Sequence, residues 1–120
     1  MNESISEIKR MDIYMADLPA VGGSVQYGYR PVVVVQNNVG NVSSPTVIVV
    51  PLTTKPKKPM PTHVKLKSCE AVQSNTTALC EQIMTISTDR LVKKLGNIDD
   101  LTTIGRINLA LFISLGFDGR

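Results

Sequence analysis

The sequence predicts a protein made mainly of β-strands, folded as a small, strongly bent antiparallel barrel with one α-helix packed on it. Short runs of β-branched and aliphatic residues recur along most of the chain, and Gly, Pro, Asn and Ser bound them. This pattern is typical of short strands joined by turns. A single helical pattern follows near the C-terminus. Many short strands followed by one terminal helix favour such a barrel.

The first three expected strands are the clearest. Residues 12–18 alternate in polarity and predict a half-buried strand with Ile13, Met15 and Leu18 as its apolar positions. The second strand is expected to begin at Pro31, which lacks an amide hydrogen and suits a strand's first position. In the third strand, residues 46–53, Pro51 predicts a sheet edge or a β-bulge.

The remaining elements are shorter. They are expected to be a glycine-rich loop at 24–29, a turn at 37–45, a stiff basic connector at 55–61, a strand at 62–66 with Val64 and Leu66 on one face, a polar turn at 67–75, a strand pair or bent strand at 76–86, and a last strand at 91–98. Asp99 or Asp100 can then cap a helix that ends at Gly116. The apolar positions expected to face the sheet are Leu101, Ile104, Ile107, Leu111 and Leu115.

Length and composition favour one domain. The 120 residues, 42% hydrophobic and 19% charged, can bury a core. We expect residues 1–8 to form an N-terminal extension and residues 9–120 a single domain. No apolar run approaches the ~20 residues of a membrane span, and the polar N-terminus does not resemble a signal peptide, which predicts a cytoplasmic protein. Cys69 and Cys80 are expected to be free thiols, with a disulfide as the less favoured alternative.

Charge is distributed unevenly along the chain. The net charge is only +3, but no acidic residue occurs between Asp17 and Glu70. The same stretch carries Arg30, Lys55, Lys57, Lys58, Lys65 and Lys67. A surface of one sign of charge indicates a polyanionic or acidic partner. The alternative is a lysine-rich loop that is merely solvated.

Seven segments carry a resemblance to a known family. They are DIYMADL, GSVQYGYRPVVVVQN, GNVSSPTVIVVPLT, MPTHV, LCEQIMTIS, DRL and ALFISLG. In this order and spacing, across residues 9–116, they resemble the MazF/PemK-type toxins of type II toxin–antitoxin systems, which are sequence-specific endoribonucleases (mRNA interferases). The resemblance implies an SH3-like barrel and a homodimer whose interface helps to shape an RNA groove. It also implies an acidic antitoxin that occupies this groove, and DNA binding by the toxin–antitoxin complex.

The resemblance also implies site residues. Arg30 matches the arginine of a Gly-x-Arg-Pro-Val motif and Thr53 a threonine at the end of the third strand, both assigned to catalysis in the family. The substrate-binding residues expected here are Ser24, Gln26, Tyr29, Thr54, Lys55, Lys57, Glu81 and Gln82. Three positions depart from the family pattern: Met11 replaces a glycine, Val25 a glutamate and Met84 an arginine.

The chemistry expected is RNA cleavage by attack of a ribose 2′-OH on the adjacent phosphorus, with no metal and no cofactor. Arginine suits the charge that develops on phosphate oxygens because its planar fork donates paired hydrogen bonds. His63, the only histidine, is a general base by type, but a structural role is favoured, as it is for the carboxylate of Glu81. Two alternatives remain: a toxin of the same barrel family that poisons DNA gyrase, and a catalytically weak relative that still binds antitoxin.

Overall fold

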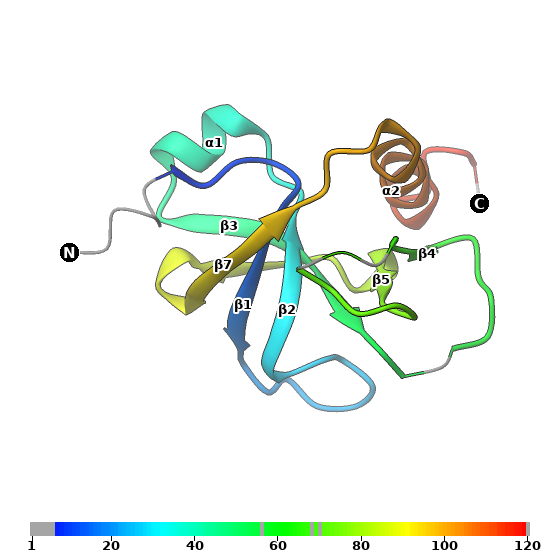
Figure 1. The fold of residues 1–120 in the computed structure, drawn as a ribbon, viewed down its shortest axis with the longest axis horizontal. Helices are drawn as coiled ribbons and strands as arrows, with labels where there is room; N and C mark the ends of the chain where they lie inside the picture. The colour runs from blue at the N-terminus through cyan, green and yellow to red at the C-terminus, as the bar shows by residue number, and fades with distance from the viewer. Residues whose placement is uncertain (1–6, 56, 68, 70, 120) are drawn as a thin grey trace.

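Seven strands and two α-helices make up the part of the chain that the computed structural model describes, residues 7–55, 57–67, 69 and 71–119 (Figure 1). In chain order they are β1 (Asp12–Leu18), β2 (Gly28–Val34), α1 (Asn38–Ser43), β3 (Thr46–Thr53), β4 (His63–Lys65), β5 (Thr77–Leu79), β6 (Met84–Ser87), β7 (Leu91–Asn97) and α2 (Leu101–Ser114). Two 3₁₀ turns, η2 (Cys80–Gln82) and η3 (Thr88–Arg90), flank β6.

The strands form one antiparallel sheet in the order β4-β5-β3-β2-β1-β7, and β6 also pairs with β3. Among the described residues no ladder joins β4 to β7, so the sheet is an open barrel. The predicted fold class, mainly β and barrel-like with a C-terminal helix, is confirmed. The helix α2 covers the side of the molecule that carries β4 and η2 (Figure 1).

Strand β3 has two partners along one edge. Its first four residues, 46–49, pair with β6, and its last two, 52–53, pair with β5. Pro51 therefore lies between the two partners, where no ladder on that side requires an amide hydrogen. The predicted edge is therefore confirmed locally, on the side of β3 where neither β6 nor β5 pairs with Pro51, although β3 as a whole is a central strand. The missing N–H lies where the partner strand changes.

Two apolar clusters lie on opposite faces of the central strands. Val33 and Leu52 belong to the cluster that α2 covers through Ile107. Val32 and Val49 belong to the second cluster, which packs around Tyr14. Strands buried on both faces have continuous apolar sequences, and this explains the runs in β2 and β3. It also corrects the expectation for β1, which is not half-buried: Tyr14 and Ala16 are fully buried, whereas the expected core residue Met15 is only partly so.

Other boundaries differ from the predictions for local reasons. Strand β2 begins at Gly28 rather than Pro31, because pairing with β1 continues beyond the proline. The expected turn at 37–45 contains a short helix, α1, whose N-cap Asn37 accepts a hydrogen bond from the amide of Gly40. The residues that predict a turn are also those that cap a short helix.

The C-terminal helix is confirmed, but its buried stripe is narrower than expected. Asp100 is the N-cap, and hydrogen bonds from the side chain and backbone of Thr103 lower the pKa of its carboxyl. Leu101 and Leu115 were wrongly assigned to the core: they are 83% and 56% exposed. The buried residues of the helix are Thr103, Ile107, Ala110 and Leu111.

The helix ends at the expected residue. Gly116 has a φ of 79°, and its amide donates to Ile113 while the amide of Phe117 donates to Phe112. The rings of Phe112 and Phe117 lie 5.6 Å apart between centroids. These are the two backbone bonds and the apolar contact of a Schellman motif.

Few features of the remaining chain bear on the site. Ile8 is buried against the second cluster, whereas residues 1–6 of the expected N-terminal extension lie outside the described residues. Both cysteines are free, as predicted. Burial, with a contribution from Glu81, raises the pKa of the Cys80 thiol to about 12, so this thiol is a core group and not a nucleophile.

No helix among the described residues is long and apolar enough to cross a membrane.

Met11 supplies a test of backbone strain. It has a φ of 76° although its side chain is buried, and a left-handed backbone costs a non-glycine residue on the order of 1–2 kcal/mol. We expect Met11→Ala and Met11→Gly both to destabilise the fold by loss of packing. Met11→Gly should be the more stable of the two in urea denaturation, by roughly 1 kcal/mol.

The matched control is Met15, which lies in β1 and has no positive φ. Here the order should reverse, with Met15→Ala more stable than Met15→Gly. The same order at both positions would show that the left-handed backbone of Met11 carries no cost.

Candidate functional site

Arg30 and Thr53 come from the neighbouring strands β2 and β3. The β2–β3 ladder ends at the pair Val32 and Pro51, and Arg30 and Thr53 each lie two residues beyond that pair, at the same end of the ladder. On its other side Arg30 is paired with Ala16 of β1. Directly opposed residues of antiparallel strands point to the same face. The structure thus brings together the cation and the hydroxyl that the sequence places at two strand ends.

The guanidinium of Arg30 is held at one point only. Its Nε donates a hydrogen bond of 2.7 Å to the backbone carbonyl of Tyr27. Its terminal nitrogens make no hydrogen bond or ion pair with any described residue. The fixed Nε orients the plane of the fork, and the two terminal groups remain available to an anionic oxygen pair.

Thr53 ends β3 in a buried setting. Its Oγ1 accepts a hydrogen bond of 3.2 Å from the amide of Lys55, which leaves the hydroxyl proton free to be donated. Thr77 of β5 lies opposite Thr53 and is also buried. Thr77 was not among the predicted site residues, because no local pattern in a short segment shows which strand it will pair with.

The loop before Arg30 is tied to η2 by one side chain. Gln82 Oε1 accepts a hydrogen bond of 2.9 Å from the amide of Gln26, and Gln82 Nε2 donates one of 3.3 Å to the carbonyl of Ser24. The predicted residues Ser24, Gln26 and Gln82 are therefore adjacent. The side-chain Oε1 of Gln26 is buried and has no hydrogen-bond partner among the described residues.

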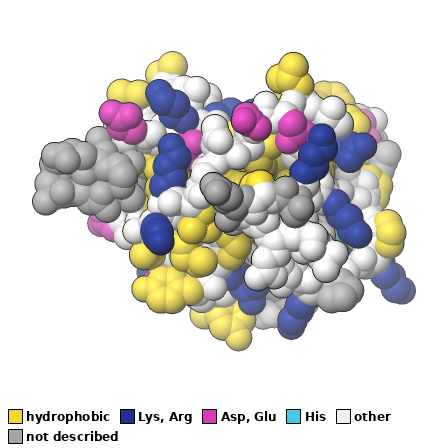
Figure 2. All heavy atoms as spheres, viewed as in Figure 1, with side chains coloured by type: hydrophobic (Ala, Val, Ile, Leu, Met, Phe, Trp, Pro, Cys, Tyr) yellow, Lys and Arg dark blue, Asp and Glu magenta, His cyan; other side chains and the backbone are white. Residues whose placement is uncertain are grey.

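A basic groove lies beside the end of β3. It consists of two adjoining hollows of about 300 Å³ each, which share Lys57, Lys65 and Thr77. The further lining residues are Thr54, Lys55, Lys58, Pro59, Met60, His63 and Asn75. No carboxylate of a described residue lines either hollow. Figure 2 shows blue side chains along the right and lower edges of this face, whereas the acidic ones in view lie towards the top and left.

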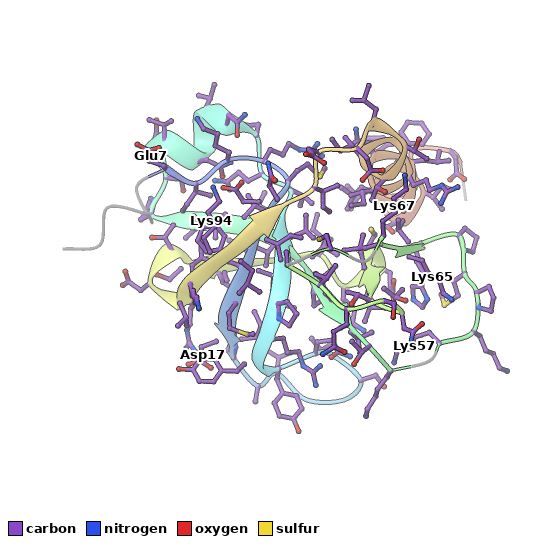
Figure 3. All side chains as sticks on the ribbon, viewed as in Figure 1. Glu7, Asp17, Lys57, Lys65, Lys67 and Lys94 are labelled. Atoms are coloured by element: carbon purple, nitrogen blue, oxygen red, sulfur yellow. The ribbon has the colours of Figure 1, made fainter. Side chains whose placement is uncertain are left out.

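The groove combines predicted and unpredicted residues. Thr54, Lys55 and Lys57 were expected to bind substrate, and the structure groups them. Lys65, which comes from β4, lines both hollows and was not predicted as a site residue. Its only signal in the sequence was its place in the acid-free stretch. Lys57 and Lys65 lie together at one side of the molecule, far from Lys94 of β7 (Figure 3).

Glu81 is engaged elsewhere. One carboxylate oxygen accepts a hydrogen bond of 3.1 Å from Thr62, and the other lies 3.0 Å from His63 Nε2. The His63 side chain is only 9% exposed, against 33% for Glu81. The buried Nδ1 of His63 has no hydrogen-bond partner among the described residues. These contacts lie within the protein, as expected for the structural role favoured for Glu81 and His63.

The other predicted positions lie at the margin of the site. Tyr29 is highly exposed and is paired with Asp17, on the opposite face of β2 from Arg30. Val25 is partly buried in the loop. Met84 packs partly buried against the second cluster, so an apolar contact occupies the position of the family's arginine. Among the described residues, no group of three or more His, Cys, Asp and Glu could hold a metal ion.

Comparisons with known proteins agree on one family. Residues 9–114 match the model of the PemK-like, MazF-like toxins of type II toxin–antitoxin systems. The chain is 44% identical to an endoribonuclease MazF of Staphylococcus saprophyticus, with 91% of this chain and 92% of the relative covered. It is 43% identical to the endoribonuclease EndoA of Bacillus subtilis, with 90% and 94% covered.

A solved structure gives the same result. A mycobacterial endoribonuclease in complex with its cognate antitoxin superposes with a TM-score of 0.76 at 29% identity, with 91% of this chain and 95% of that chain covered.

The contacts of Glu81 predict a stability effect. Glu81→Ala leaves the nearly buried Nε2 of His63 without its partner, which should lower the free energy of unfolding by about 1–2 kcal/mol. Glu81→Gln keeps an acceptor oxygen and should cost less. Glu7→Ala, at an exposed carboxylate, serves as the control and should change stability by less than ~0.5 kcal/mol. Equal urea midpoints for Glu81→Ala and the control would contradict this role.

Proposed function

The chain belongs to the family of PemK-like, MazF-like toxins of type II toxin–antitoxin systems and is an endoribonuclease toxin, and we propose that it cleaves single-stranded mRNA without a metal, through Arg30 and Thr53. The observation that carries this proposal is the pairing of β2 with β3, because Arg30 and Thr53 each lie two residues beyond the pair Val32 and Pro51 at the same end of this ladder. The groove beside that end is lined by lysines and, among the described residues, by no carboxylate, which supports a path for a polyanion.

The proposed reaction begins with attack of a ribose 2′-OH on its own 3′-phosphorus. A bond forms from the 2′ oxygen to phosphorus as the bond to the 5′ oxygen of the next nucleotide breaks; the 2′-OH gives its proton to solvent, and the departing 5′ oxygen takes up a proton from solvent. The terminal nitrogens of Arg30 donate to the non-bridging oxygens, where negative charge increases in the transition state. The hydroxyl of Thr53 donates a hydrogen bond to one of these oxygens or orients the nucleophile. Arg30 stays protonated throughout, because guanidinium is not deprotonated in proteins.

In this proposal, the groove residues bind the RNA strand on either side of the cleaved bond. Lys55 and Lys57 contact phosphates, and we add Lys58 and Lys65, which line the same hollows. The buried Oε1 of Gln26 lacks a partner and suits a donor group on an unstacked base, the means by which single-stranded RNA is read. The further contacts proposed are those of Ser24, Tyr29, Thr54 and Glu81; Gln82 was also expected to contact the substrate, but both atoms of its side-chain amide are bonded to the loop.

The proposed partners follow the family. A mycobacterial relative is known in complex with its cognate antitoxin, and we expect an acidic antitoxin to occupy the groove of this chain. A homodimer, a single domain over residues 9–120 and a cytoplasmic location complete the proposal. The matched family and the names of the relatives give no support to a gyrase poison.

Arg30→Ala should keep the fold and cleave a long RNA at least ~100-fold more slowly in the presence of EDTA. Loss of one preorganised donor in a dry site costs on the order of 3 kcal/mol of the barrier. The measurement is the initial rate of cleavage with end sequencing, after circular dichroism has shown the same fold as the parent.

Arg106→Ala is the matched control, because Arg106 is an exposed arginine of α2, and it should cleave at the parent rate. Full cleavage by Arg30→Ala would refute the catalytic assignment. A parent protein that binds antitoxin but leaves RNA uncut would be a catalytically weak relative. Its departures from the family pattern at Val25 and Met84 would then be the candidate causes of the lost activity.

The groove lysines should govern affinity and not the chemical step. The double variant Lys57→Ala, Lys65→Ala should raise KM with little change in kcat. For single-stranded RNA it should also reduce the slope of log affinity against log salt by about 1.4, because each phosphate contact contributes about 0.7. Lys93→Ala is the control: Lys93 is exposed on β7, at the opposite end of the sheet from β4. An unchanged salt slope in the double variant would remove these lysines from the RNA path.

A further inference from the structure

The side chain of Gln82 is joined to Arg30 through the backbone of one loop. We infer that Gln82 is a positioning residue for the reaction: it fixes the loop at 24–27, and the loop fixes the orientation of the Arg30 guanidinium. This inference rests on the proposed function, in which Arg30 stabilises the transition state. It gives Gln82 a role that differs from direct contact with the substrate.

The contacts form an unbroken series. Gln82 accepts a hydrogen bond of 2.9 Å from the amide of Gln26 and donates one of 3.3 Å to the carbonyl of Ser24. The residue after Gln26 is Tyr27, whose carbonyl accepts the hydrogen bond of 2.7 Å from Arg30 Nε. A displacement of the loop therefore moves the only protein acceptor, among the described residues, to which the guanidinium is bound.

The far end of the series is rigid. Gln82 ends η2, which begins at the fully buried Cys80 and packs against α2 and β3. The amide of Cys80 also donates a hydrogen bond of 3.0 Å to the carbonyl of Thr62 beside β4. Gln82 thus projects from a turn that packing holds in place, and the hydrogen bonds of its side-chain amide hold the loop against that turn.

The loop has little else to hold it. Residues 20–24 are exposed, and Gly22 and Gly23 have positive φ with open space around them. Among hydrogen bonds between described residues, those of Gln82 are the only ones that join the backbone of residues 20–26 to another part of the chain. A loop released from Gln82 would let Arg30 sample orientations that miss the phosphate, and a misplaced catalytic donor lowers the rate and not the affinity.

Graded variants separate the two hydrogen bonds. Gln82→Ala removes both. Gln82→Glu keeps an acceptor for the amide of Gln26 but loses the donor to the carbonyl of Ser24, so it should hold the loop less firmly than the parent and more firmly than Gln82→Ala. Gln73→Ala is the matched control, because Gln73 is an exposed glutamine whose side chain makes no hydrogen bond with a described residue.

The test combines a measurement without RNA and one with it. The first is the hydrogen-exchange rate of the Arg30 Nε–H, followed by ¹⁵N NMR of the free protein. The second is steady-state cleavage of a single-stranded RNA. Gln82→Ala should raise the exchange rate and lower kcat about tenfold, as expected for the loss of about one net hydrogen bond, with KM unchanged. Gln82→Glu should fall between Gln82→Ala and the parent in both, and Gln73→Ala should match the parent.

The outcomes distinguish this inference from the proposed function. An unchanged exchange rate of the Arg30 Nε–H in Gln82→Ala would overturn the inference, and so would a rise in KM alone, which would identify Gln82 as a substrate contact. If Arg30→Ala is slow while Gln82→Ala matches the parent, the inference fails and the function stands. If Arg30→Ala cleaves at the full rate, the function fails, and the exchange rate alone still decides whether Gln82 orders the arginine.

Discussion

The double pairing of β3 is the constraint on which the rest of the structure depends. One edge of this strand binds β6 for four residues and then β5 for two, with Pro51 between them. Because the sheet changes partner there, β5 and β4 follow the last residues of β3 and carry Thr77 and Lys65 to the side of Thr53. The opposite edge of β3 stays on β2, which brings Arg30 to the same place. The proposed catalytic residues and the basic groove therefore lie together because of how the strands pair.

The fold could be predicted from the sequence wherever a local pattern is sufficient. The runs of β2 and β3, the N-cap Asp100 and the helix end at Gly116 all depend on neighbouring residues. The errors concern burial decided by distant segments. Tyr14 is in the core because β2 and β7 flank β1, whereas Leu101 is exposed because the buried side of α2 is formed by Thr103, Ile107, Ala110 and Leu111. Neither fact is present in the pattern of a single element.

The residues of the site also fall into two groups: those that a local sequence pattern predicts and those that only the folded chain reveals. Arg30, Thr53 and the lysines of the connector stand out because a motif or a one-sided charge surrounds them in the sequence. Thr77 and Lys65 are ordinary strand residues whose importance comes only from their neighbours across the sheet. Gln82 lies 56 residues from Gln26 in sequence, so only the folded chain shows that the two are bonded.

The series from Gln82 to the carbonyl of Tyr27 consists of a side-chain amide and of backbone amides and carbonyls, none of which carries a net charge, and the charged Arg30 guanidinium joins it only at the last hydrogen bond. Dissolved salt screens interactions between exposed charges over about 10 Å at 0.1 M, but it weakens a short contact between neutral dipoles far less. The lysines of the groove are subject to this screening, whereas the two hydrogen bonds between Gln82 and the loop join neutral groups. We therefore expect a change in ionic strength to alter how much RNA is captured more than it alters the position of the loop that holds the guanidinium. In the proposed function, capture and alignment are thus two separately adjustable properties.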